Sequence, residues 1–220
     1  YYDDFNKTDD FHKVLFRPGF SIQARELTTL QSILQNQIEE HGNHMFKEGS
    51  VVIPGQVSYS RAYYSLALES TFGGEDVRPS QYYNPTTPVV LTGETSGVKA
   101  QVVGYADGST TTQPYVYLQY IQTGDDLSTD KFLDSENLVA DATITHTTSY
   151  AANVASGTTF SSSAANTGSA VTVEDGIYFV RGNFVRCAKQ TVVLSNTSNQ
   201  VTSRVGFIVN ETLISPETDS

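Results

Sequence analysis

The stretch that decides the N-terminal part of the fold is SIQARELTTLQSILQNQIEEHGNHM, which runs from Ser21 to Met45. Its apolar-type positions step by 3, 4, 4, 3 and 4 residues, a spacing that predicts an amphipathic α-helix; they are Leu27, Leu30, Leu34, Ile38, His41 and Met45. Ser21 is expected to cap its N-terminus, and Gly42-Asn43 its C-terminus. A strict heptad at 27, 30, 34, 37 and 41 would include Gln37 and His41. The pattern therefore favours one helix packed on a body or in a short bundle over a long coiled coil.

After Gly49 the helical period disappears and short β-type segments follow. We expect strands at 51–53, 57–68, 89–91, 99–105, 115–122, 140–147, 171–173, 176–180, 183–187, 191–194 and 204–210. Arg181-Gly182-Asn183 is typical of a tight hairpin turn. Glycines and prolines predict a loop at 71–88, and acidic residues predict a loop with a short helical turn at 125–137. The expected fold class is mainly β with an N-terminal helical arm (α+β), built from several small antiparallel β modules.

Four consecutive segments are expected along the chain. They are an arm and helix (1–50), short strands and a Pro/Gly loop (51–88), a β meander with a Ser/Thr-rich loop (89–170), and an antiparallel segment (171–220) that continues beyond a fragment. Between residues 141 and 170, 13 of 30 residues are Ser or Thr. Such side chains bury little apolar area, which predicts a surface loop or a weakly packed hairpin. On this basis residues 149–169 are expected to be dispensable for folding.

Composition excludes several classes of function. The chain carries 24 acidic and 13 basic residues and a formal charge of −11, so it would repel phosphate backbones and we expect no nucleic-acid partner. Its longest apolar runs are far too short for a membrane span. Cys187 is the single cysteine, so no internal disulfide can form. The missing initial Met and the abrupt end suggest a processed chain or a fragment.

No sequence pattern indicates catalysis or a cofactor. In Gly93-Glu94-Thr95-Ser96-Gly97 the serine stands one place late for a nucleophile elbow, and the stretch is typical of a turn. His41 and His44 could share a metal or meet symmetry mates on an oligomer axis, or simply contact carbonyls at the helix end. The acidic clusters around Asp3 and Asp125 lack the pattern of a calcium loop. We therefore expect no enzyme activity, no catalytic residue, no cofactor and no metal.

Long motifs at both ends of the chain resemble a family of tailed-phage virion proteins that is catalogued mainly as a domain of unknown function. The motifs are Tyr2-Asp3-Asp4-Phe5, Leu15-Phe16-Arg17-Pro18-Gly19, Gln23-Ala24-Arg25-Glu26-Leu27, Leu34-Gln35-Asn36-Gln37-Ile38-Glu39, Phe46-Lys47-Glu48-Gly49-Ser50-Val51-Val52, Gly176-Ile177-Tyr178-Phe179-Val180-Arg181-Gly182, Val185-Arg186 and Arg204-Val205-Gly206-Phe207. The middle, about 82–170, matches least. The resemblance implies a virion structural protein at the baseplate or fibre-attachment region of the tail, made in the host cytoplasm.

These observations predict a tail protein that acts through protein contacts. Its expected partners are its own copies, as a homotrimer joined through the helix, and other tail or baseplate proteins. The expected interface residues are Tyr2, Phe5, Phe16, Arg17, Arg25, Leu27, Leu30, Leu34 and Ile38. Intramolecular packing explains the same apolar stripe, and remains an alternative at this point. The alternative function is a host-surface glycan-binding or depolymerising tail protein that uses the tyrosine-rich middle module.

Overall fold

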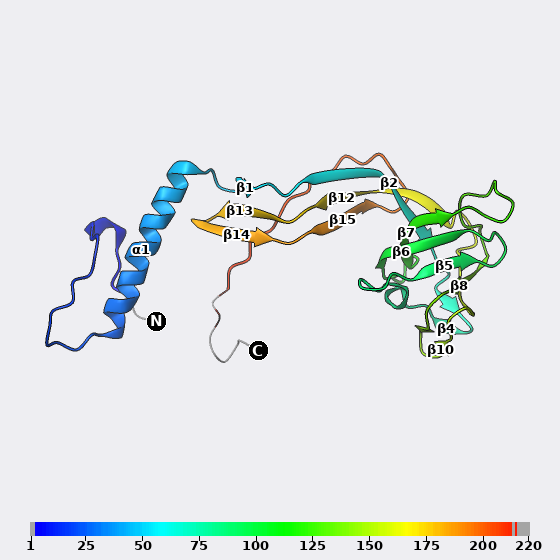
Figure 1. Ribbon diagram of the computed structural model, residues 1–220, viewed down its shortest axis with the longest axis horizontal. Helices are drawn as coiled ribbons and strands as arrows, with labels where there is room; N and C mark the ends of the chain where they lie inside the picture. Colours follow the sequence, from blue (N-terminus) through cyan, green and yellow to red (C-terminus); the bar gives the residue numbers. More distant parts are fainter. Residues whose placement is uncertain (1–2, 213, 215–220) are drawn as a thin grey trace. The chain divides into compact units, whose positions relative to one another are not determined.

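The computed structural model describes residues 3–212 and 214 and confirms the expected fold class (Figure 1). It is mainly β, with one N-terminal α-helix and several antiparallel sheets. Chain contacts divide it into two compact units, each described separately below. Unit 1 consists of Tyr1–Val57, Val173–Gln190 and Gly206–Ser220, and unit 2 of Ser58–Thr172 and Thr191–Val205. Both units thus combine stretches that are distant in the sequence, rather than following the four expected consecutive segments.

Unit 1 contains the predicted helix, α1, with boundaries that differ from those expected. It spans Ala24–Met45 and follows a short 3-10 turn, η1 (Lys7–Asp9). The N-cap is Gln23, not Ser21: its backbone N–H donates to Glu26 Oε2 at 2.9 Å, and the Gln23 side chain accepts from the Glu26 backbone. This reciprocal capping box satisfies two donors that a helix start otherwise leaves unpaired. The predicted stop at Gly42-Asn43 is wrong, because the helix continues through it to Met45.

The helix continues through Gly42 because an aromatic ring occupies the place of the missing side chain. Gly42 is buried, and a Cβ there would lie 2.5 Å from a ring carbon of Phe179. Phe179 belongs to a three-stranded sheet ordered β1 (Val51–Ile53), β13 (Gly176–Val180), β14 (Asn183–Cys187). The predicted hairpin between β13 and β14 is confirmed, with Arg181 at φ 47° and Gly182 at φ 77° as a type I′ turn requires.

This contact reverses the usual effect of replacing a helical glycine by alanine. Alanine is normally the better helix former by about 1 kcal/mol. A methyl group at Gly42 must displace the fully buried Phe179 ring, so we expect Gly42→Ala to lower the free energy of unfolding by about 1–3 kcal/mol. The neighbouring exposed position supplies the control: Asn43→Ala should be neutral or slightly stabilising. Chemical denaturation followed by circular dichroism measures both, and a stabilised Gly42→Ala variant would contradict the packing described.

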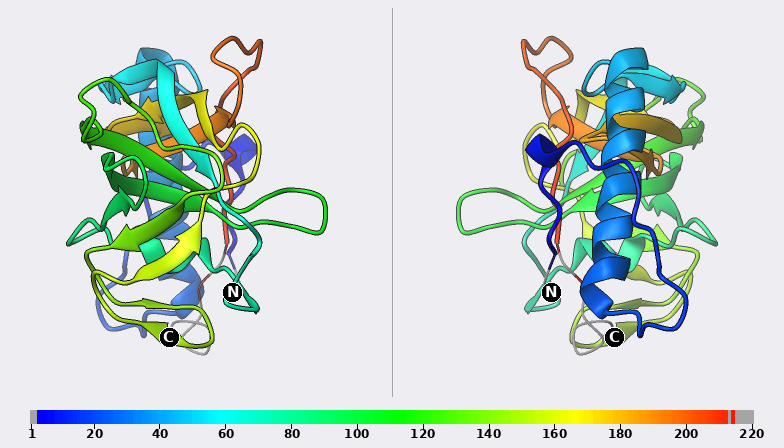
Figure 2. Two further views of the ribbon diagram at one scale, coloured as in Figure 1. Left: turned by 90° about the vertical axis from the view of Figure 1, so that its right-hand side faces the viewer. Right: turned by 90° about the vertical axis from the view of Figure 1, so that its left-hand side faces the viewer.

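Unit 2 is built on an eight-stranded sheet with the order β11-β8-β5-β6-β7-β2-β12-β15. Its strands appear in the left view of Figure 2. The bounds are β2 (Val57–Ala67), β5 (Val90–Gly93), β6 (Lys99–Ala106), β7 (Tyr115–Gln122), β8 (Asn137–Ala140), β11 (Ala155–Thr158), β12 (Ala165–Val173) and β15 (Gln190–Ser195).

The backbone at the end of β2 forms hydrogen bonds with the backbone at the end of β11. These two strands are not neighbours in the sheet order, so the bonds join two separate parts of the sheet. Leu68 and Thr159 form a bridge, Glu69 N–H donates to Thr158 O at 2.9 Å, and Phe160 N–H donates to Ala67 O at 2.9 Å. This pairing covers edges that would otherwise expose unpaired backbone groups. The enclosed core is apolar and includes Leu66, Leu68, Tyr82, Leu91, Val98, Val102, Val116, Leu118, Phe132, Leu138 and Ile144.

Of the two alternatives for 141–170, the surface loop is wrong, and a short hairpin of two-residue strands accounts for only a small part of the segment. The segment contains β9 (Ile144–Thr145), β10 (Ser149–Tyr150), all of β11 and part of β12. Its small polar side chains are buried rather than solvated: Ser156, Thr159 and Ser169 are each 0% exposed. Small side chains allow close backbone approach, so their low apolar area did not indicate exposure.

Four smaller predictions also fail in whole or in part. The strand expected at 140–147 divides into β8 and β9. The expected loop at 71–88 contains a hairpin of β3 (Thr71–Phe72) and β4 (Glu75–Asp76), followed by the 3-10 turn η2 (Pro79–Tyr82). Residues 204–210 form no strand. Residues 125–136 are loop, as expected, but contain no helical turn, and Asn137 already begins β8.

Candidate functional site

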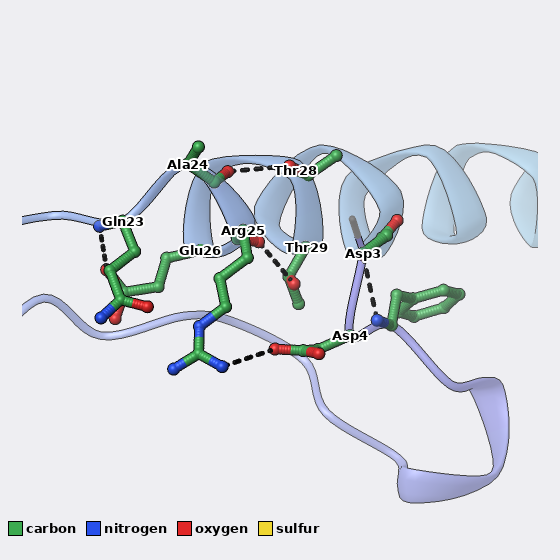
Figure 3. A network of polar contacts seen from close by, with 9 residues as sticks. Asp3, Asp4, Gln23, Ala24, Arg25, Glu26, Thr28 and Thr29 are labelled. Atoms are coloured by element: carbon green, nitrogen blue, oxygen red, sulfur yellow. Dashed lines mark hydrogen bonds and ion pairs between the residues drawn. The ribbon is translucent and has the colours of Figure 1, made fainter. Parts of the chain in front are cut away.

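One face of α1 is covered by the N-terminal arm, residues 3–20, which runs beside the helix in the right view of Figure 2. Arg25 Nη1 lies 3.6 Å from Asp4 Oδ2, and Figure 3 shows this pair at the helix start. The Ser32 hydroxyl donates to Asp3, and Lys7 pairs with Glu40 further along. Hydrogen bonds from Ser32 and from the Phe5 N–H lower the pKa of Asp3. The arm is therefore attached to the helix mainly by exposed polar contacts.

A second face of α1 is covered by the β13–β14 hairpin. Gln35 Nε2 donates to Asn183 Oδ1 at 3.1 Å. A Cβ at Gly182 would lie 2.5 Å from Glu39 Cγ, so the hairpin turn lies directly on the helix. Together with Gly42 and its Phe179 contact, these residues leave little room for another partner on this face.

The third face of α1 is apolar and exposed. Leu27, Leu34, Ile38 and Met45 are 49%, 50%, 55% and 63% exposed, although each is a large hydrophobic residue. Gln31 and His41, also exposed, lie between them. We call the six residues Leu27, Gln31, Leu34, Ile38, His41 and Met45 the α1 seam. A contiguous apolar face of this kind on a described surface is a candidate binding site.

The structure divides the predicted interface residues. Leu27, Leu34 and Ile38 lie in the α1 seam, whereas Leu30 is partly buried toward the packed side, where Ile33 is 2% exposed. Arg25 pairs with Asp4 of the same chain, and the Arg17 guanidinium stacks 4.9 Å from the Phe20 ring centroid. Phe5 is partly buried and Phe16 is 42% exposed. Tyr2 lies outside the described residues.

Unit 1 as a whole buries very little apolar surface. Among its described residues, Ile33 and Phe179 are the only buried hydrophobic ones. Its exposed large hydrophobic residues are far more numerous: besides the seam they include Phe11, Leu15, Phe16, Phe20, Ile22, Val51, Ile53, Phe184, Val185, Phe207, Ile208 and Val209. Phe46 and Phe184 meet edge to face at 5.7 Å between centroids, but this aromatic contact leaves Phe184 54% exposed. Unit 2, in contrast, has a closed core of its own.

Unit 2 carries one notable pocket in the described part of the chain, with a volume of about 400 Å³. Two aromatic rings form part of its wall: Tyr64 and Tyr120 meet edge-on at 5.2 Å between centroids. The Lys131 ammonium lies 5.9 Å from the Tyr64 ring centroid. The lining is completed by polar and apolar side chains, Gln119, Ile121, Gln122, Thr123 and Asp130. Rings beside hydrogen-bonding groups are able to contact a sugar.

Ser96 and Asp126, which belong to two stretches considered for chemistry, make hydrogen bonds within turns. Ser96 is 7% exposed; its hydroxyl donates to Glu136 Oε1 at 3.1 Å and accepts from the Val98 N–H at 3.2 Å. Asp126 accepts hydrogen bonds from Thr129 and Ser128, which lower its pKa, and so it closes a turn. Within residues 3–212 and 214, no three or more His, Cys, Asp or Glu side chains gather as a metal site would require.

Two buried tyrosines of unit 2 allow the pH dependence of its stability to be predicted. Burial raises the pKa of Tyr82 and of Tyr120 above the usual value. The Tyr82 hydroxyl also donates a hydrogen bond to Ser156 O at 2.7 Å, which requires its proton. The unfolded state loses these protons near pH 10 while the folded state keeps them. Stability should therefore fall as the pH rises above about 10. In an ultraviolet titration these two tyrosines should ionise among the last, together with unfolding, and Tyr82→Phe should reduce that late phase. Ionisation of every tyrosine in one early transition would contradict it.

Comparison with known proteins gives one match. A family described as a domain of unknown function, DUF4815, matches residues 1–71, which include the arm, α1, β1 and β2. The matched stretch thus contains the α1 seam but not the pocket of unit 2. No curated protein matches the chain. No solved structure matches it either. Within the described residues, none of the helices has the length and apolar character needed to cross a membrane.

Proposed function

We propose that this chain is a non-enzymatic structural subunit of a tailed-phage virion, located in the tail or baseplate region, where it acts in assembly or fibre attachment. The observation that carries the proposal is the uncovered apolar surface of unit 1. Among its described residues, two hydrophobic side chains are buried, whereas many large ones are exposed. Surface of this kind is stabilised when another protein covers it. The resemblance of both chain ends to virion proteins supports the choice of a phage tail.

The proposed partners are further copies of the chain, as a homotrimer, and neighbouring tail or baseplate proteins. The α1 seam serves the contact between copies. The arm, with Phe11, Leu15 and Phe20 between 64% and 78% exposed, serves contacts with neighbouring subunits. The function needs no cofactor, metal or catalytic residue.

A double substitution in the seam tests the assembly role. Leu34→Ser with Ile38→Ser removes two side chains that are half exposed in the single chain, so the fold of unit 1 should tolerate it. If copies cover the exposed half of each side chain, the change should weaken association by about 1.5–3 kcal/mol per chain. Sedimentation should show an oligomer for the wild type and monomers for the variant, with the β circular dichroism unchanged. Leu127→Ser, at an 85% exposed position of unit 2, is the matched control and should leave the oligomer intact.

The virion assignment is tested separately. Antibodies raised against the purified chain should decorate the tail of virions of the phage that encodes it, viewed by electron microscopy. Virions whose tails remain undecorated, with no peptide of the chain detected in them by mass spectrometry, would overturn the assignment whatever the oligomeric state.

A second function, binding of host-surface glycan, is favoured by the pocket beside Tyr64 and Tyr120. Under this alternative, a glycan array should show a signal that Lys131→Ala removes. Glu94→Ala, an exposed change outside the pocket lining, is the control. Turnover of host polysaccharide would extend the alternative to a depolymerase, whereas absence of binding leaves the structural role as the better account.

A further inference from the structure

The α1 seam has the spacing of a coiled-coil core. Its six residues step by 4, 3, 4, 3 and 4 along the helix. This heptad register differs from one that starts 27, 30, 34, because it takes Gln31 in place of Leu30. In it Leu27, Leu34 and His41 occupy d positions, and Gln31, Ile38 and Met45 occupy a positions. All six are exposed in the single chain, so the whole core row is free.

The charges of α1 lie away from this row. The flanking e and g positions hold Thr28, Leu30, Gln35, Gln37, Gly42 and His44, without Asp, Glu, Lys or Arg. Three of these flanking positions already contact the same chain: Gln35 and Gly42 lie against the β13–β14 hairpin, and Gln37 donates to His12 O of the arm. Arg25, Glu26, Glu39 and Glu40 all occupy b and c positions, on the side that faces the arm or the hairpin. In a chain with a formal charge of −11, two copies can therefore bring these seams together without facing like charges. A strongly basic partner would find no carboxylate there.

We propose that the α1 seam is a parallel, in-register coiled-coil contact with other copies of this chain. The inference rests on the proposed function and names the surface and geometry of the self-contact. Parallel helices follow from a three-fold assembly, because rotation about one axis keeps all copies in the same direction. Leu30 adds apolar area to one flank of the seam, which suits a bundle of more than two helices.

The two polar positions fix the register of this contact. In register, Gln31 faces Gln31 and His41 faces His41, so each polar side chain meets a hydrogen-bonding partner. A shift of one heptad places Gln31 against Ile38 and His41 against Leu34, and leaves buried polar groups unpaired. A single polar core position is known to select register in this way, at a cost in stability.

Disulfide trapping tests orientation and register in the full chain. Cys187 is first replaced by Ser, since it is the only native cysteine. Leu27→Cys and Met45→Cys then place thiols at the two ends of the seam, about 27 Å apart along the helix. We expect each variant, oxidised alone, to shift to a covalent dimer. Asn43→Cys, exposed at an f position, is the control and should remain largely monomeric on the same gel.

An antiparallel contact would instead place Leu27 opposite Met45. It would give a covalent dimer only when the Leu27→Cys and Met45→Cys variants are mixed, and that result would overturn the proposal. Absence of all these links in a wild type that still sediments as an oligomer would also overturn it, while leaving the proposed assembly function intact. A wild type that is monomeric at every concentration would remove the self-contact altogether, and decoration of the virion tail would still decide the proposed location.

Substitution of the polar positions provides an independent readout. Gln31→Leu with His41→Leu should strengthen association and relax the register. Mixed Leu27→Cys and Leu34→Cys chains, one heptad apart, should link in this background but not with Gln31 and His41 present. Equal linking in both backgrounds would contradict the assigned role of the two polar residues.

Discussion

Replacement of residues 149–169 by a short Gly/Ser linker is expected to unfold unit 2. The replaced segment includes β11, which pairs with β8, and the first half of β12, which lies between β2 and β15. It also includes the Leu68–Thr159 bridge and the backbone bonds beside it. The change opens the core, so the loss should approach the whole stability of a domain, about 5–15 kcal/mol.

Thermal unfolding followed by β circular dichroism, together with the near-ultraviolet tyrosine signal, measures this loss. The matched control replaces residues 109–112, which are all exposed, with glycine and serine. That loop joins β6 to β7 and should tolerate the change, because closure entropy varies slowly with loop sequence and length. A 149–169 variant that melts like the wild type would mean that β11 and β12 are not part of the folded sheet.

The position of this segment could not be predicted from its composition. Hydropathy treats Ser156, Thr159 and Ser169 as solvent-exposed, yet each is fully buried beside backbone. The Ser169 hydroxyl donates to Ser198 O at 3.0 Å, a partner 29 residues away. At Gly168 a Cβ would overlap the Ser195 carbonyl oxygen, so only glycine fits this close strand approach. These requirements come from long-range pairing, which no local pattern expresses.

The periodic parts of the chain were predictable because their signals are local. The 3.6-residue spacing identified α1, and the Arg181-Gly182 turn identified the β13–β14 hairpin. The seam itself was located only in part. Five of its six positions lie in the stripe expected from the sequence, but Gln31 is polar, and the sequence pattern takes the neighbouring Leu30 in its place. The structure separates these two neighbours by the packing of the arm and hairpin around the helix.

Glu136 is a second element that the sequence did not mark, since it stands in a run typical of an acidic surface loop. It is 3% exposed. Its carboxylate accepts from the Ser96 N–H at 3.0 Å, the Ser96 hydroxyl at 3.1 Å and the Leu133 N–H at 2.6 Å. The backbone N–H of Glu136 donates to Thr159 Oγ1 at 2.9 Å. Gly93 leaves the space for this carboxylate, because a Cβ there would lie 2.5 Å from Glu136 Oε2. One buried residue thus joins three segments: its carboxylate holds the turn after β5 to the loop before β8, and its backbone N–H bonds to the end of β11.

Removal of this carboxylate is the point substitution for which we expect the largest loss of stability. Glu136→Ala leaves the Ser96 and Leu133 N–H groups without an acceptor, and each unsatisfied buried donor costs about 1–3 kcal/mol. With two such donors left, we expect the free energy of unfolding of unit 2 to fall by about 2–6 kcal/mol. Glu136→Gln keeps one acceptor oxygen and should lose less stability.

Glu94→Ala is the control. Glu94 is an exposed acid whose bond to Asn137 faces solvent, so its replacement should cost under about 1 kcal/mol. Urea denaturation of the three variants gives the comparison. If Glu136→Ala were no more costly than Glu94→Ala, the two N–H groups would have to find water, and the carboxylate would not hold the turn after β5 to the loop before β8.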